Sequence, residues 1–130
     1  MSDTALRRIL YVDDDDDLRS IAVFALEALG GFEVAACASG TEALACAAEF
    51  QPQLLLLDVM MPEMDGPAVL RALRGLPVTA ATPAVFMTAA TRPEEVARFV
   101  AGGAIDVIAK PFDPMTLPET VLMAWSRRDG

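Results

Sequence analysis

Five short apolar runs alternate along this chain with longer segments of helical periodicity. Such an alternation is typical of strand–helix units whose strands pair in parallel. The runs predict strands at residues 8–12, 32–37, 53–57, 84–88 and 105–109. The sequence therefore predicts an α/β domain built on a five-stranded parallel sheet.

The third run indicates how this sheet is covered. Four leucines follow one another at residues 54–57, with no polar residue between them. Successive side chains of a strand point to opposite faces of its sheet, so this strand is apolar on both faces. We therefore expect helices on both sides of the sheet.

The segment after the first strand carries its apolar residues at helical spacing. They fall at i, i+3, i+4, i+7, i+8 and i+11, which is the pattern of one helix face. The residues are Leu18, Ile21, Ala22, Ala25, Leu26 and Leu29. We expect this stripe to be buried against the sheet.

Sequence signals also mark where helices begin. Residues 39–42 (SGTE) and 91–94 (TRPE) match the capping box, in which two side chains accept hydrogen bonds from free N–H groups of the first turn. A helix starting at Asp113 would place Pro118 about five residues inside, where proline clashes with the preceding turn. We therefore expect the last helix to begin irregularly, or only near Leu117.

Length and composition exclude several classes of protein. The 130 residues fit a single domain, which we take as residues 1–130. No apolar run approaches the roughly 18 residues of a membrane span, and the start lacks the apolar region of a signal peptide. We expect a cytoplasmic protein that does not contact membranes.

Charge and cysteine content exclude further classes. A net charge of −9 argues against direct nucleic-acid binding, which needs clustered Lys and Arg. The two cysteines, Cys37 and Cys46, fit reduced and buried small side chains better than a disulfide framework. The chain has no histidine, the commonest zinc ligand, so we expect neither redox nor zinc chemistry.

Polar residues follow the ends of four predicted strands. Ligands of an open parallel sheet bind outside the carboxyl ends of its strands, so these residues should share one rim. They are Asp13, Asp14, Asp58, Thr88 and Lys110. Three adjacent carboxylates repel one another unless a cation joins them, and a divalent ion together with the lysine would balance their charge.

With these motifs in place, the chain resembles a response regulator receiver domain of bacterial two-component systems, similar to free-standing chemotaxis regulators. The matching segments are LYVDD, LLLLDVMMPEMDG, FMTAA and IAKPFDP, each at the end of its own strand. The resemblance covers essentially the whole chain. It implies a flavodoxin-like, doubly wound (βα)5 fold with a five-stranded parallel sheet in the order 2-1-3-4-5.

The resemblance also implies a phosphorylation site that uses Mg²⁺. Asp58 resembles the phosphoryl acceptor, and it would share Mg²⁺ with Asp14 and the backbone carbonyl of Met60. Asp13 would act on the ion through water. Thr88 would bind a phosphoryl oxygen, and Lys110 would contact first Asp58 and then the phosphoryl group.

The chain departs from the family pattern at its switch. Many members carry an aromatic residue three positions before the lysine, and its ring moves with the hydroxyl residue; here Thr88 is present but Val107 stands at the aromatic position. A valine has no large ring to swing. We therefore expect signalling to rely on the loop after Thr88 and on the fourth helix. The resemblance also implies a cis bond between Lys110 and Pro111.

The expected partners follow from the same resemblance. Because the chain has no histidine, the phosphohistidine donor must be a separate histidine kinase or histidine phosphotransfer protein. The chain ends 19 residues after Pro111, so we expect a separate output protein or a receiver excised from a longer chain. We expect a monomer or a weak dimer that catalyses only its own phosphorylation and dephosphorylation.

The sequence offers three alternatives. An EF-hand beginning at Asp13 fails because its turn position is Leu18 rather than Gly and its twelfth position is Phe24 rather than Glu. A haloacid-dehalogenase-like phosphatase needs a second Asp two residues after the acceptor, where this chain has Met60. A degenerate receiver that serves only as an interaction module stays open, although the intact acidic and basic residues argue against it.

Overall fold

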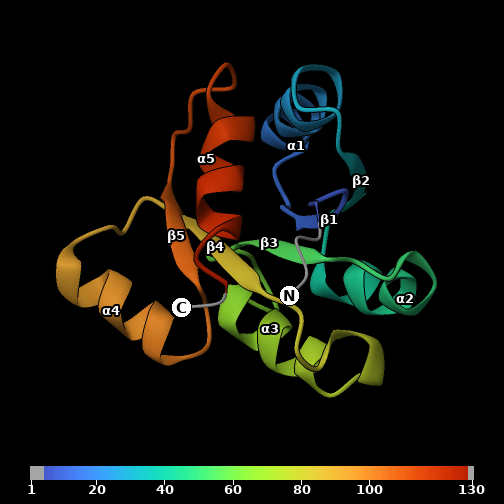
Figure 1. Ribbon diagram of the computed structural model, residues 1–130. Coiled ribbons are helices and arrows are strands. Elements are labelled where there is room, and N and C mark those ends of the chain that lie inside the picture. The colour runs from blue at the N-terminus through green and yellow to red at the C-terminus, as the bar shows by residue number, and fades with distance from the viewer. Residues whose placement is uncertain (1–4, 129–130) are drawn as a thin grey trace.

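The computed structural model describes residues 5–128, which form five parallel strands in the order β2-β1-β3-β4-β5 (Figure 1). The strands are β1 (Arg8–Val12), β2 (Glu33–Cys37), β3 (Leu54–Asp58), β4 (Ala84–Thr88) and β5 (Asp106–Ala109). All five predicted strands are present within one residue of their expected bounds. The predicted flavodoxin-like fold and strand order are confirmed, while residues 1–4 and 129–130 of the expected domain lie outside the described residues.

Within residues 5–128, five α-helices cover the two faces of the sheet. They are α1 (Asp16–Phe24), α2 (Gly40–Phe50), α3 (Gly66–Arg74), α4 (Pro93–Ala101) and α5 (Leu117–Trp125). Helices α1 and α5 lie on one face, and α2, α3 and α4 lie on the other (Figure 1). Among residues 5–128, no helix combines the length and the apolar character that a bilayer crossing requires.

The sheet separates two apolar cores, as the unbroken leucine run predicts. In β1, Ile9 and Tyr11 pack with α1 and α5, whereas Leu10 and Val12 pack with α2 and α3. Every residue of β3 and β4 is buried. Burying apolar surface on both faces of the central strands is the main source of stability for such a sheet. It also fixes where their carboxyl ends lie.

The expected stripe of the first helix is only partly buried. Ala22, Ala25 and Leu26 are fully buried, but Ile21 and Leu29 are 45% and 46% exposed. Ile21 lies at the margin of the helix face. Leu29 would lie near its centre in a regular helix, but the segment η1 (Ala25–Leu29) is π-helical, and its wider turn rotates Leu29 away from the sheet.

One capping prediction is confirmed and the other is wrong. The Ser39 hydroxyl accepts the Glu42 N–H at 3.2 Å and caps α2 as expected. Thr91, however, is not the N-cap of α4. Arg92 occupies that position, and the Glu95 carboxylate accepts its backbone N–H at 3.1 Å. The start is displaced by one residue because Pro93, with its fixed φ, takes the first helical position.

The last helix begins at Leu117, which confirms the second of the two expected starts. Pro118 therefore lies in the first turn, where its missing N–H costs no helical hydrogen bond. The turn before the helix starts at Asp113, whose carboxylate accepts the Met115 N–H at 3.0 Å. Asp113 thus shapes the approach to α5 rather than its cap.

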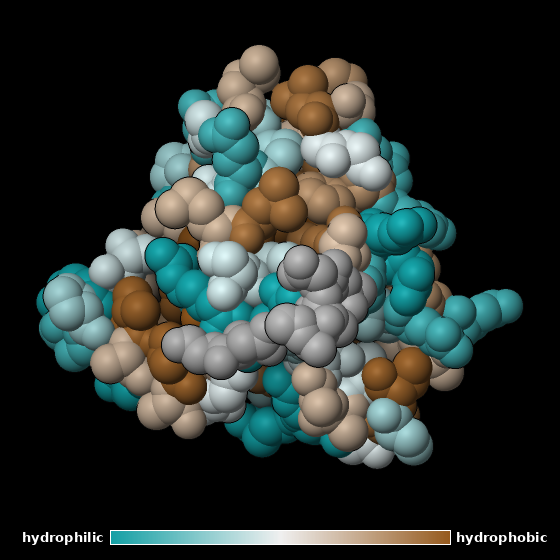
Figure 2. Space-filling view, in the orientation of Figure 1, coloured by the Kyte–Doolittle hydropathy of each residue, from teal (hydrophilic) through white to brown (hydrophobic). Residues whose placement is uncertain are grey.

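Helix α4 is less buried than the other four α-helices. None of its residues is fully buried, and Val100 is 46% exposed. Figure 2 shows hydrophobic residues at the surface over this helix, at the left of the view. Its main aromatic contact with the sheet is Phe99 against Phe86, with ring centroids 5.2 Å apart and planes tilted by 59°.

Candidate functional site

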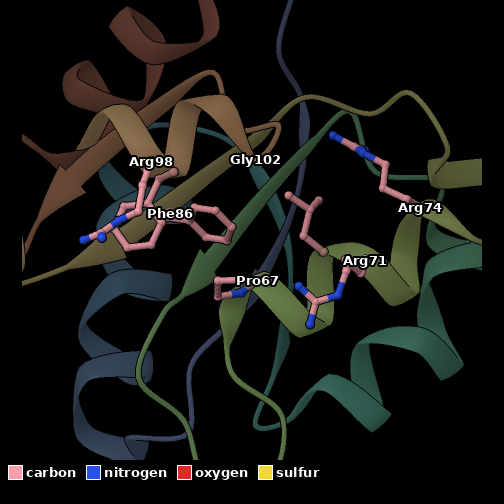
Figure 3. Close-up of a pocket in the computed structure, with 8 residues that line it drawn as sticks. Pro67, Arg71, Arg74, Phe86, Arg98 and Gly102 are labelled. Carbon is pink, nitrogen blue, oxygen red and sulfur yellow. The ribbon is translucent and has the colours of Figure 1, made fainter. Parts of the chain in front are cut away.

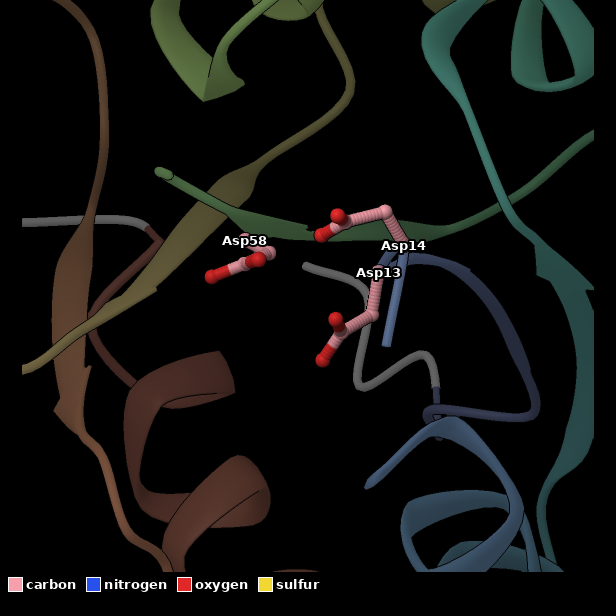
Figure 4. A group of neighbouring side chains, drawn as sticks. All are labelled: Asp13, Asp14 and Asp58. Carbon is pink, nitrogen blue, oxygen red and sulfur yellow. The ribbon is translucent and has the colours of Figure 1, made fainter. Parts of the chain in front are cut away.

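Three carboxylates meet where the neighbouring strands β1 and β3 end. Asp13, Asp14 and Asp58 each place one carboxylate oxygen within 4.8 Å of the others (Figure 4). Asp13 and Asp58 are buried, whereas Asp14 is exposed. The parallel pairing of β1 with β3 brings together residues that are more than forty positions apart in the chain.

Asp13 is held rigidly at this site. The Tyr11 hydroxyl donates to Asp13 Oδ2 at 2.7 Å, and the Asp15 N–H donates to Oδ1 at 3.0 Å. The Arg19 guanidinium donates to the Asp13 carbonyl at 2.8 Å. Burial and the hydrogen bond to Asp13 raise the pKa of Tyr11, which keeps its hydroxyl protonated as a donor.

Tyr11 and Arg19 were not identified from the sequence. Tyr11 lies two residues before Asp13, and side chains two apart in a strand point to the same face, so its position was a usable signal. Arg19 gave no comparable signal, because its bond to the Asp13 carbonyl depends on how α1 leaves the sheet.

Lys110 and Asp58 form the central ion pair of the site. The ammonium of Lys110 donates to Asp58 Oδ1 at 3.0 Å and lies 3.7 Å from Asp13 Oδ2. Burial raises the pKa of Asp58 above its usual range, the lysine opposes this rise, and the charges of Asp13 and Asp14 add to it. With three carboxylates and one ammonium in contact, this acidic pocket carries an excess of negative formal charge.

The other oxygen of Asp58 retains some contact with solvent, although Asp58 as a whole is only 3% exposed. No hydrogen bond within residues 5–128 reaches Asp58 Oδ2, and no buried side-chain oxygen or nitrogen in that range lacks a partner. This oxygen must therefore be accessible. It is the atom of the site best placed to react with an incoming group.

Lys110 reaches the site from the end of β5. Its backbone N–H donates to the Thr88 carbonyl at 2.9 Å, and its bond to Pro111 is cis, as the resemblance implies. Burial lowers the pKa of Lys110, but the hydrogen bond to Asp58 and the charge of Asp13 raise it by more. The lysine therefore stays positively charged.

Thr88 and Val107 lie on the adjacent strands. Thr88 is 2% exposed, and its hydroxyl accepts the Ala90 N–H at 3.0 Å rather than contacting Asp58. Val107 is half-buried in β5 and pairs with Phe86 of β4. The structure thus places Thr88 at the same sheet edge as the carboxylates, with its hydroxyl bound to the following loop.

The loop after β3 brings α3 close to the acidic pocket. The Gly66 N–H donates to the Val59 carbonyl at 3.0 Å. A Cβ at Gly66 would lie 2.6 Å from the Asp58 carbonyl oxygen, so only glycine permits this approach. Met60 is 77% exposed, and its side chain contributes little to the core.

The donor set suits a hard divalent cation. Carboxylate and carbonyl oxygens are the protein ligands that Mg²⁺ prefers. A cation would relieve the repulsion that helps to raise the pKa of Asp58. Asp16 and Asp17 belong instead to the exposed first turn of α1, which Asp15 caps through the Leu18 N–H at 3.0 Å. These helical residues rule out the EF-hand alternative.

Comparisons with known proteins agree with this geometry. The family model for the response regulator receiver domain matches residues 9–122. The DNA-binding response regulator MtrA of Mycobacterium bovis is 39% identical over 127 residues, which make up 98% of this chain and 54% of that protein. The chain thus spans about half the length of this curated relative.

Solved structures give the same result. The chemotaxis protein CheY4 of Vibrio cholerae superposes with a TM-score of 0.83 and 34% identity, covering 92% of this chain and 99% of that one. A putative response regulator from Chloroflexus aurantiacus gives a TM-score of 0.80 and 32% identity, covering 94% and 99%. The chain therefore belongs to the family of response regulator receiver domains, the phosphoryl-accepting domains of two-component signalling.

Proposed function

We propose that Asp58 accepts a phosphoryl group from the phosphohistidine of a partner protein, in a reaction that depends on Mg²⁺. The observation that carries this proposal is the contact between Lys110 and one oxygen of Asp58, which leaves the second oxygen open beside two further carboxylates. Members of this family partner with histidine kinases or histidine phosphotransfer proteins. We take residues 1–130 to act as one receiver domain.

The acidic pocket would hold the cation. Asp14, Asp58 and the Met60 carbonyl are the proposed direct ligands, and Asp13 would act through water. When bound, Mg²⁺ supplies positive charge that offsets the repulsion between an anionic nucleophile and an anionic phosphoryl group. The bonds from Tyr11 and Asp15 N–H hold Asp13 in place for this role.

The side chains of Asp58 and Lys110 would carry out the chemical step. Asp58 Oδ2 attacks phosphorus, the P–N bond to the donor imidazole breaks, and its electron pair stays on the imidazole nitrogen. An acyl phosphate forms on Asp58. Lys110 holds Oδ1 and then pairs with the phosphoryl oxygens, because its ammonium is a mobile point charge on a flexible stem. Water later cleaves the new P–O bond, so the chain acts only on itself.

Phosphorylation of Asp58 would change the molecular surface through a movement of Thr88. Its hydroxyl now accepts the Ala90 N–H, and moving to a phosphoryl oxygen would break that bond and shift the loop before α4. The weak burial of α4 favours such a shift. Val107 would move only slightly when Thr88 moves, since it has no ring to rotate. The altered surface would bind a separate output protein, with the receiver acting as a monomer or a weak dimer in the cytoplasm.

Incubation with acetyl phosphate and Mg²⁺, followed by intact mass measurement, tests this function. We expect the mass of one phosphoryl group to be added, and we expect EDTA or Asp58→Asn to prevent the addition. An unmodified wild-type chain that is folded by circular dichroism would support the degenerate-receiver alternative instead.

A further inference from the structure

A pocket of about 560 Å³ lies between α3 and α4, apart from the acidic site. Its wall is apolar, with Leu70 and Pro67 from α3, Phe86 from β4 and Phe99 from α4. This volume is within the range of small-molecule sites in proteins. The weak burial of α4 leaves this space open.

Two arginines line the pocket, one from each of the two helices. Arg71 extends from α3 and Arg98 from α4, on either side of Phe86 (Figure 3). Within residues 5–128, neither guanidinium forms an ion pair or a side-chain hydrogen bond. Both are exposed. Two unpaired guanidinium groups beside one pocket are notable in a chain with 19 acidic and 10 basic residues.

A third arginine lines the pocket but has a different role. The Arg74 guanidinium donates to the carbonyls of Thr79 and Thr82 at 2.9 and 2.6 Å. Its charge is therefore engaged in holding the loop after α3. Only Arg71 and Arg98 remain available to an incoming group.

We propose that this pocket binds a small amphipathic anion, with an aromatic or aliphatic body and a carboxylate or phosphate group. The body would pack on Leu70, Phe86 and Phe99, and the anionic group would pair with Arg71 and Arg98. Guanidinium groups bind both carboxylates and phosphates through paired hydrogen bonds. An inorganic anion would leave the apolar wall uncovered, and a neutral apolar molecule would leave both charges unpaired.

An NMR titration of the ¹⁵N-labelled full chain with 2-naphthoate tests the proposal. Neutral 2-naphthylmethanol and inorganic phosphate serve as comparison probes. We expect 2-naphthoate to shift the amides of residues 67–74, 86 and 98–102, and to bind more tightly than either comparison probe. The double variant Arg71→Gln with Arg98→Gln should bind 2-naphthoate about tenfold more weakly. Arg7→Gln changes net charge away from the pocket and should alter binding by less than about twofold.

Four outcomes would overturn the proposal. Equal binding of the neutral alcohol would show that the arginines do not recognise the ligand, and unchanged affinity in the double variant would place the probe elsewhere. Shifts of the same amides on raising the protein concentration alone would assign the pocket to a second copy of the chain. Binding of an acidic peptide of Glu and Phe, without binding of 2-naphthoate, would assign it to a protein partner.

Discussion

Lys110 lies closer to Asp58 than to Asp13, with its ammonium 3.0 Å from the first carboxylate and 3.7 Å from the second. The lysine thus contacts the proposed phosphoryl acceptor directly while still neutralising part of the buried Asp13 charge. From this position the Lys110 ammonium can shift its contact from the Asp58 carboxylate to the oxygens of a phosphoryl group. This arrangement suggests that Lys110 couples the chemistry to the conformation.

The first prediction separates the charge of Lys110 from its geometry. Lys110→Arg keeps the charge but misplaces the donors, and Lys110→Ala removes both. We expect both variants to be phosphorylated slowly at Asp58. Neither should reproduce the amide shifts at residues 89–96 and 105–109 that beryllofluoride induces in the wild type, measured by paired NMR spectra. Wild-type shifts in Lys110→Ala would mean that Thr88 alone carries the signal.

The second prediction concerns Asp14. We expect weak Mg²⁺ binding in the wild type and no phosphorylation of Asp14→Ala, because an exposed ligand of the proposed site is lost. Without metal, the variant should be slightly more stable, since it lacks one like charge near Asp58. A relief of about 0.5 kcal/mol would raise Tm by roughly 1–3 °C. Phosphorylation at the wild-type rate would refute the assignment.

The third prediction concerns the lifetime of the acyl phosphate. In the resembling family, residues at the positions of Met60 and Ala90 flank the path of the attacking water, and neither side chain here forms strong hydrogen bonds. We expect slow autodephosphorylation. Met60→Asn or Met60→Glu should accelerate it several-fold and leave the fold unchanged, because Met60 is exposed. Equal decay rates in all three proteins would show that another feature controls water access.

The fourth prediction concerns Gly66. A Cβ there would meet the Asp58 carbonyl oxygen at 2.6 Å and the Val59 Cα at 2.9 Å, so the backbone itself would have to move. We expect Gly66→Ala to cost about 1–3 kcal/mol of folding free energy and to slow phosphorylation. Gly75→Ala is the matched control, because its Cβ meets only the Ala72 carbonyl at 3.3 Å. Urea unfolding should show a smaller loss in the control.

The fifth prediction concerns the Cys37 thiol and pH. Burial and the neighbouring Cys46 sulfur, 3.5 Å away, raise the pKa of Cys37 to about 12. The native thiol should react with iodoacetamide about a thousandfold more slowly at pH 8 than the unfolded one, since the thiolate is the reactive form. The protection of the native Cys37 thiol against iodoacetamide should decline as the pH rises toward 12. The raised pKa also means that folding stability falls as pH rises above the ordinary thiol pKa.

Mass spectrometry of the wild type after labelling and cleavage at Glu42, which separates Cys37 from Cys46, measures this reactivity. Rapid labelling of Cys37 in the folded protein at pH 8 would contradict its burial. Both cysteines are free thiols, but the expectation of two buried side chains holds only for Cys37, because Cys46 is partly exposed.

The sequence by itself determined the strands and the edge that carries the polar residues. Apolar runs such as residues 54–57 can bury both faces only inside a sheet covered on both sides, so local pattern and global fold agree there. Capping at Ser39 was equally predictable, since it depends on residues three apart. Residues directly after parallel strands must share an edge, which located Asp13, Asp58 and Lys110 together.

Only the tertiary structure decided how these residues meet. Which carboxylate Lys110 contacts, and which oxygen of Asp58 stays open, depend on the path of β5 beside β4 and not on any local pattern. The π-helical turn that exposes Leu29 likewise reflects how α1 joins β2. The pocket flanked by Arg71 and Arg98 arises from the gap between two helices, and packing across such distances leaves no periodic signal in the sequence.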